Sequence, residues 1–232
     1  MGIENNSNKE LWKRVSTGAS GTLALKIISL SLGFLINVIL ARLLGVKEFG
    51  AYTFSLAWAG LLGVPALMGL DSFLVRKISA YQNQCEWRLM RGALSWANKI
   101  SWVSSFSLGG LAILGALISR NQMEPAVFET FCIAMFLIPL TTSARIRQSV
   151  LQGLNKITLG QMPEQIIFPV LFIALSSSIW LFSAESFSPQ TVMSLRLLAM
   201  GIVFFFGIFL LRRVLPESVK SATPQFKTTE WF

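Results

Sequence analysis

Histidine is absent from this chain of 232 residues, and only two cysteines are present. The absence of histidine excludes most zinc hydrolases, histidine-based nucleophiles and histidine proton relays. Cys85 and Cys132 cannot build a metal site alone. The topology predicted below places them in a cytoplasmic loop and a membrane helix, so we expect no disulfide. No Walker loop occurs either. We therefore predict neither an enzyme nor a cofactor.

Charged residues are scarce as well, at 13% of the chain against about 25% in typical soluble domains. Hydrophobic residues make up 53%, with 18 Phe and 7 Trp, and the mean hydropathy is +0.60. A soluble core of this size cannot hide so much apolar surface. Disorder is excluded because disordered chains are poor in apolar residues and rich in charge. The composition therefore predicts an all-α membrane protein.

The intervals between charges organise the chain, since a helix needs roughly 20 apolar residues to cross a bilayer. We predict a cytoplasmic N-terminal segment (1–17), a transmembrane bundle (18–212) and a cytoplasmic tail or linker (213–232). Within the bundle, six transmembrane helices are expected at about 18–41, 49–70, 92–119, 125–145, 164–185 and 190–211. A signal peptide is the alternative for the first, but no small-residue cleavage site follows it.

The segment between the second and third predicted helices, residues 72–92, is amphipathic. An amphipathic helix with aromatic and aliphatic side chains on one face commonly lies in the membrane interface. We therefore predict that Phe73, Leu74 and Trp87 point into the inner membrane surface.

The distribution of Lys and Arg predicts the orientation, because cytoplasmic loops are enriched in both. With the N-terminus inside, 14 of the 20 fall on the cytoplasmic side and 4 on the outer side. Both termini are thus expected in the cytoplasm. The net charge of +9 then needs no nucleic-acid partner.

Polar side chains form a stripe on the first predicted helix, where Lys26, Ser29, Gly33 and Asn37 are spaced 3, 4 and 4 residues apart. This spacing places them on one face. Polar residues inside a bilayer often mark a pathway, and this set suits a water-filled cavity that accepts an anion. The alternative is that Lys26 reaches the headgroups while Ser29 and Gly33 form a packing seam.

A second stripe lies on the fourth predicted helix, with Thr141, Arg145, Gln148 and Gln152 at similar spacing. Arg145 offers a fork of donors that suits a phosphate, although anchoring at the inner boundary is the alternative. Arg147 points to the other side of the helix.

Other charged residues are less easily assigned. Lys99 is interpreted as an interfacial residue, with a ligand contact as the alternative, and Arg42 and Arg196 are interpreted as anchors at outer helix ends. Asp71 and Glu164 are single carboxylates at inner helix ends. We therefore expect no acid within the membrane to carry a coupling ion.

Three stretches resemble a known family. ARLLGVKEFGAYTFSLAWAGLLG (41–63), GLDSFLVRKIS (69–79) and RQSVLQGLNKITLGQMPEQIIFPVLF (147–172) are similar to segments of bacterial polysaccharide exporters. These are the lipid-linked oligosaccharide flippases, including those for O-antigen repeat units, of the multidrug, oligosaccharidyl-lipid and polysaccharide exporter superfamily. The resemblance extends from about Gly18 to Phe232.

The resemblance implies an inner-membrane protein of polysaccharide or lipopolysaccharide biosynthesis. Members carry two helical bundles that rock around a central, often cationic cavity. They move an undecaprenyl-diphosphate-linked oligosaccharide to the periplasmic leaflet. Lys26, Arg42, Lys99 and Arg145 are the candidates for the cavity lining, with Ser29, Asn37 and Gln148 beside them.

The chain departs from that pattern because it holds only one predicted bundle. It is thus expected to be a truncated N-terminal half, to pair with a second bundle-bearing chain or to form a homodimer. Two alternative functions stay open. A cation-coupled drug exporter predicts a membrane-buried acid, and a non-transporting scaffold for glycan assembly predicts that the polar stripes are dispensable.

Overall fold

The computed structural model describes the backbone of residues 2–182 and 187–226, and the side chains of 21–181 and 187–226. The described chain is almost wholly helical and contains no strand, which confirms the all-α prediction. Its elements are α1 (Gly2–Leu67), α2 (Leu70–Gln84), α3 (Trp87–Ile118), η1 (Arg120–Gln122), α4 (Pro125–Met135), α5 (Leu137–Gly153), α6 (Ile157–Met162), η2 (Pro163–Ile167), α7 (Phe168–Phe182), α8 (Pro189–Val214) and α9 (Glu217–Ser221).

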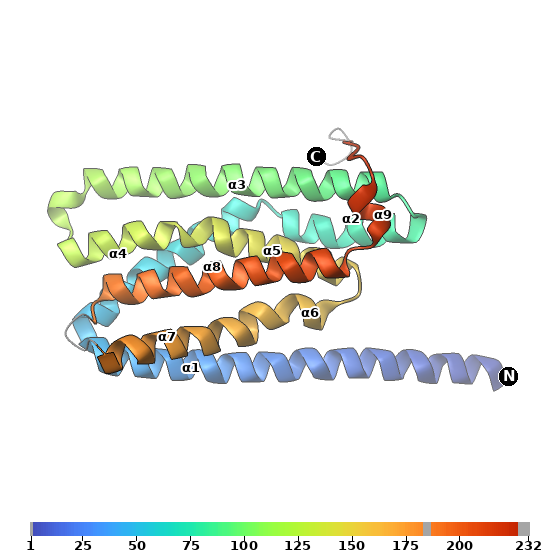
Figure 1. The fold of residues 1–232 in the computed structure, drawn as a ribbon, viewed down its shortest axis with the longest axis horizontal. Helices are drawn as coiled ribbons and strands as arrows, with labels where there is room; N and C mark the ends of the chain where they lie inside the picture. Colours follow the sequence, from blue (N-terminus) through green and yellow to red (C-terminus); the bar gives the residue numbers. More distant parts are fainter. Residues whose placement is uncertain (1, 183–186, 227–232) are drawn as a thin grey trace.

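Five helical stretches of the described chain are long and apolar enough to cross a membrane. The first, Gly21–Leu67, has 47 residues and would extend roughly 70 Å if straight, far more than one crossing needs. It is bent at Gly45, whose φ of 76° and ψ of 172° are not helical. Figure 1 shows the chain turning back after this bend. Thus α1 holds both the first and the second predicted segments, and the count of six crossings stays a prediction.

The bend depends on glycine, because a side chain at that φ and ψ is strained. Replacing Gly45 with Ala is expected to cost about 1–3 kcal/mol of stability. Gly50→Ala is the control, since Gly50 lies in the same helix, has ordinary helical geometry and has open space at its Cβ position. The thermal unfolding midpoint of the purified protein in detergent measures both. Equal midpoints for the two variants would contradict a bend specified by glycine.

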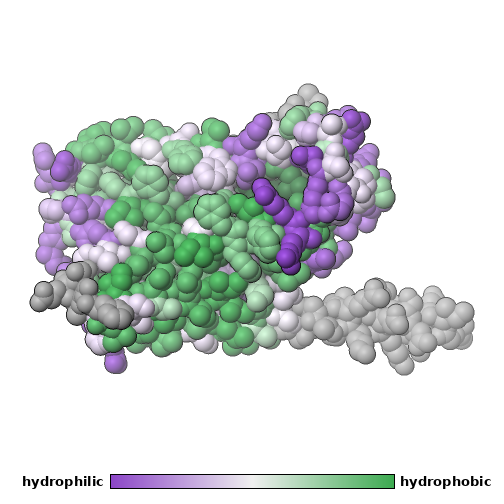
Figure 2. Space-filling model, in the orientation of Figure 1, coloured by the Kyte–Doolittle hydropathy of each residue, from purple (hydrophilic) through white to green (hydrophobic). Residues whose placement is uncertain are grey.

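Polar contacts join separate segments of the chain at both ends of the bundle. At one end Lys47 forms an ion pair with Glu124. At the other end the guanidinium of Arg88 donates to Thr223 Oγ1 at 2.5 and 2.9 Å. Figure 2 shows hydrophilic residues at both ends and a hydrophobic belt between them. The chain is therefore built as a multi-pass membrane protein.

The core lies in two clusters of buried apolar side chains. The larger cluster joins α1, α4, α5, α7 and α8 around Leu40, Tyr52 and Phe172. The smaller cluster joins α2, α3 and α5 near the end that carries α9, and includes Met90 and Val150. Because lipid is as apolar as these side chains, close packing rather than the hydrophobic effect holds such helices together.

The prediction that Leu74 points into the membrane surface is wrong. Helix α2 packs against α3 and α5, and Leu74 and Ile78 are fully buried in the smaller cluster. Gly153 permits this approach, because a Cβ there would lie 2.8 Å from the Ile78 Cβ and 3.1 Å from the Val75 carbonyl oxygen. The amphipathic pattern correctly indicated a helix with one apolar face, but protein covers the Leu74 side of that face.

Candidate functional site

A cavity of about 800 Å³ lies between the second half of α1, α5, η2, α7 and α8. Its walls combine apolar and glycine positions of α1 with polar side chains from the other elements. The polar lining residues are Asp71, Thr141, Thr142, Arg145, Gln148, Glu164, Gln165 and Arg196. A concave site with a few converging polar groups inside an apolar bundle is the usual form of a ligand pocket.

Helix α5 supplies the side chains of the second predicted stripe. Thr141, Arg145 and Gln148 line the large cavity because their spacing brings them to one side of the helix. Gln152 joins Arg145 and Gln148 in an adjoining polar cavity of about 120 Å³. Arg145 is exposed, and its guanidinium has no hydrogen bond or ion pair among the described residues.

A largely buried ion pair joins α5 to η2 beside this cavity. The Arg147 guanidinium of α5 contacts the Glu164 carboxylate of η2, and Gln148 Nε2 donates to the other Glu164 oxygen at 3.0 Å. The Arg147 side chain is only 4% exposed and that of Glu164 15%. Arg147 does point away from Arg145, as predicted. However, it lies inside the bundle against Gly207 of α8, where a Cβ would overlap the guanidinium.

The helical stretch that carries Glu164 begins earlier than predicted, whereas the expectation that no acid lies within the membrane stays a prediction. The fourth membrane-length stretch, which contains the predicted fifth helix, begins at Ile157, not at Glu164, and extends to Leu181. Glu164 therefore lies two turns into it, in the π-helical segment Pro163–Ile167, and lines the cavity. The sequence did not predict the start at Ile157 because α6 contains polar residues. A Pro within a helix, which often accompanies a local change of helical geometry, was the available signal.

Arg196 is also placed differently from the prediction. Instead of anchoring an outer end, its guanidinium donates to the Tyr52 hydroxyl at 2.6 Å. It lies 5.1 Å from the ring centroid of Phe168 and 5.6 Å from that of Phe172. Such stacking stabilises a cation within an apolar bundle. Arg196 thus adds a second cation to the cavity wall.

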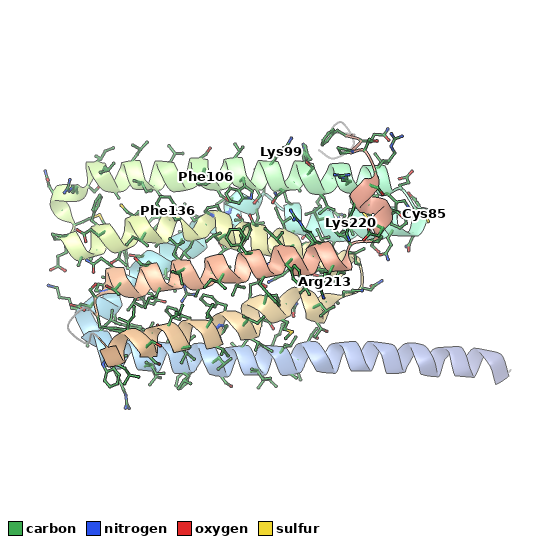
Figure 3. All side chains as sticks on the ribbon, in the orientation of Figure 1. Cys85, Lys99, Phe106, Phe136, Arg213 and Lys220 are labelled. Carbon is green, nitrogen blue, oxygen red and sulfur yellow. The ribbon has the colours of Figure 1, made fainter. Side chains whose placement is uncertain are left out.

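The remaining candidates lie outside this cavity. In α1, Lys26, Asn37 and Arg42 are exposed, and Ser29 is half-buried. Lys99 of α3 is exposed as well (Figure 3). None of the five lines this cavity or the adjoining polar cavity. Their role in a substrate pathway stays a prediction.

The packing of α1 explains why its polar stripe lies outward. Leu25, Ile36, Leu40 and Leu44 are the buried residues among 21–45 of α1, and they lie toward the bundle. Lys26 and Asn37 each follow one of these residues directly, so they are rotated by about 100° from it. The stripe therefore lies beside the packed face, on the flank of the bundle.

Comparison with known proteins assigns the family. Residues 15–229 match the family described as polysaccharide biosynthesis protein. No curated protein and no solved structure matches the chain. The match covers nearly the whole chain, including all five membrane-length stretches and the cavity. The chain therefore belongs to the polysaccharide biosynthesis protein family.

Proposed function

We propose that this chain is a transporter, or one half of one, that moves undecaprenyl-diphosphate-linked oligosaccharide across the bacterial inner membrane. The observation that carries the proposal is the Arg145 guanidinium, which lines an 800 Å³ cavity without a described ion-pair partner. A guanidinium binds phosphate oxygens with paired hydrogen bonds. In a polysaccharide biosynthesis protein, a diphosphate-linked glycan is the substrate that suits this group.

The other groups of the cavity complement this role. Gln148 and Thr141 offer neutral hydrogen bonds beside Arg145, and Arg196 adds positive charge deeper in the bundle. Glu164 also lines the cavity, but its ion pair with Arg147 offsets its charge. Charge on the transported phosphates would be neutralised during passage by Arg145 and then by Arg196. The mechanism would be alternating access, with both termini in the cytoplasm and six crossings.

The stripe on α1 enters the pathway only when a second bundle faces that helix. Lys26 and Asn37 are exposed on the flank of the described bundle, and polar groups facing lipid are costly. A second bundle, from a further chain or a second copy of this one, would cover them and close a larger cavity. Lys99 and Arg42 would take part only if that bundle also reached α3 and the Gly45 bend.

The test is glycan export in a strain that depends on this chain for its surface glycan. Arg145→Gln is expected to lower the surface glycan about 10- to 100-fold, since it removes a charge-assisted hydrogen bond to phosphate. Arg145→Lys is expected to recover only part of the loss, because an ammonium lacks the planar fork. Surface glycan is quantified per cell, with the membrane abundance of each variant measured by immunoblot.

The matched control is Arg76→Gln, which removes an exposed cation of α2 that lines neither polar cavity. It is expected to export normally. Lys26→Gln tests the α1 stripe in the same strain. Unimpaired export by Arg145→Gln at normal abundance would refute the cavity assignment and favour a non-transporting scaffold.

Glu164 favours a second candidate function, a cation-coupled drug exporter. A membrane-buried acid lining a cavity is the group such an exporter requires. Its pairing with Arg147 counts against a free ion site, and the family is one of polysaccharide biosynthesis. Drug efflux lost in Glu164→Gln, with glycan export intact in Arg145→Gln, would favour the exporter.

A further inference from the structure

A second cavity, of about 780 Å³, lies on the other side of α5 and shares no lining residue with the first. Helix α5 forms its floor, α3 and α8 form its walls, and α9 closes one end. The rings of Trp102 and Phe204 meet between α3 and α8 with centroids 6.3 Å apart, and Phe204 lines the cavity. The transport function proposed above does not involve this second cavity.

Arg147 reaches this cavity with donors that have no acceptor. Its guanidinium gives one nitrogen to Glu164, whereas the buried Nε and Nη1 have no hydrogen-bond partner among the described residues. Buried donors without acceptors are costly, and a charged group raises that cost. Since Arg147 lines the cavity, an acceptor placed there would satisfy both nitrogens.

The cavity is cationic at one end and apolar along its walls. Arg91, Arg147, Arg212 and Lys220 line it, and no carboxylate does. The backbone carbonyls of Lys220 and Ala222 accept hydrogen bonds from Arg91, and Lys220 pairs with Glu217. Arg212 is exposed, with no partner recorded in the described chain. Figure 3 shows Lys220 at the end of the bundle that carries α9.

The apolar part of the wall faces the hydrophobic belt. Leu94, Ile208 and Leu211 are half-buried residues of α3 and α8 that line the cavity. On this face, Figure 2 shows hydrophilic residues gathered at the α9 end directly beside hydrophobic surface. The ligand that matches this pattern carries an anionic phosphate joined to hydrocarbon.

We propose that this cavity binds an anionic phospholipid of the surrounding membrane, of the phosphatidylglycerol class. Its phosphate accepts hydrogen bonds from Arg147 and Arg212, and its acyl chains follow the groove between α3 and α8. Basic pockets between membrane helices at the cytoplasmic side bind other anionic phospholipid headgroups, those of cardiolipin and phosphoinositides. The volume lies within the range of small-molecule sites, roughly 300–1,000 Å³.

The test measures lipids retained by the purified full chain in detergent, by native mass spectrometry. Dioleoyl-phosphatidylglycerol is compared with zwitterionic dioleoyl-phosphatidylcholine. The wild type is expected to prefer phosphatidylglycerol about tenfold. Arg212→Gln combined with Lys220→Gln is expected to weaken that binding on the order of 30-fold, since each basic residue contributes roughly fivefold. Both side chains are exposed or near the surface, so folding is not at risk.

The matched control is Arg76→Gln combined with Arg213→Gln, which removes the same charge from exposed positions that do not line the cavity. A second variant, Ser95→Phe, fills the wall without changing charge and is expected to weaken binding as well. Ser107→Phe, on the exposed side of α3, is its control and is expected to bind normally.

Three results would overturn the proposal. One is equal retention of the two lipids by the wild type, and another is an equal loss in the charge-matched control. The third is displacement of phosphatidylglycerol by an equimolar amount of undecaprenyl diphosphate, because the occupant would then be the transported lipid. Inorganic diphosphate at the same concentration is expected not to displace it, since it lacks acyl chains.

Discussion

Replacing Glu164 with Leu is expected to destabilise the chain by about 3–5 kcal/mol, because Arg147 then keeps its charge in the bundle without a partner. Arg147 is only 4% exposed, and two of its nitrogens already have no partner within the described part of the chain. Arg147→Met is expected to cost less, since Gln148 still donates to Glu164 at 3.0 Å. Thermal unfolding midpoints of the purified variants in detergent measure the loss, which should be on the order of 10 °C for Glu164→Leu.

The double variant, Arg147→Met with Glu164→Leu, tests whether the two residues act as a pair. Apolar side chains of similar volume often replace a buried ion pair at little cost, so the double variant should recover most of the stability. Glu124→Gln is a control for an exposed pair and should change stability by less than about 1 kcal/mol. A double variant no more stable than Glu164→Leu would show that the two side chains are not coupled.

Replacing Gly207 with Ala is expected to cost about 2–4 kcal/mol, combining overpacking with displacement of the Arg147 guanidinium from Glu164. A Cβ at position 207 would overlap that guanidinium. The same change at Gly201, six residues earlier on α8, meets open space. Gly201→Ala should therefore stabilise the helix slightly, by up to about 1 kcal/mol.

The opposite signs of these two changes make the comparison informative, since both replace a helical glycine by alanine in one element. The midpoints of both variants are measured in the same detergent. In the Arg147→Met background, Gly207→Ala should lower the stability much less, because the guanidinium that it displaces is absent. If Gly207→Ala instead behaved like Gly201→Ala in the wild-type background, the packing of α8 against Arg147 would be refuted.

Much of the fold was predictable from hydrophobic runs and charge spacing. The bounds expected for the third and sixth helices, 92–119 and 190–211, fall close to α3 and α8. The start of the predicted fifth helix, residue 164, is too late, because α6 extends the helical stretch back to Ile157. Polar residues such as Thr158 and Gln161 concealed this start. The side of α2 that packs on protein was equally hidden, because amphipathic periodicity does not distinguish a lipid surface from another helix.

The candidate site was predictable in part. The spacing of Arg145 and Gln148 placed both on one side of α5, and the structure brings them into one cavity. The same spacing argument placed Lys26 and Asn37 on one face of α1. It could not predict what that face contacts. Arg196 was missed because its partners, Tyr52 and Phe168, are distant in the sequence.

The sequence by itself determined that this protein is helical, apolar and built to cross a membrane, because composition and helical period act locally. Family membership likewise follows from the chain alone. Only the tertiary structure decided which charges are buried together. Arg147 and Glu164 are separated by 17 residues and lie on different elements. Whether they meet depends on helix packing, notably at Gly207 of α8, where the missing side chain leaves room for the Arg147 guanidinium.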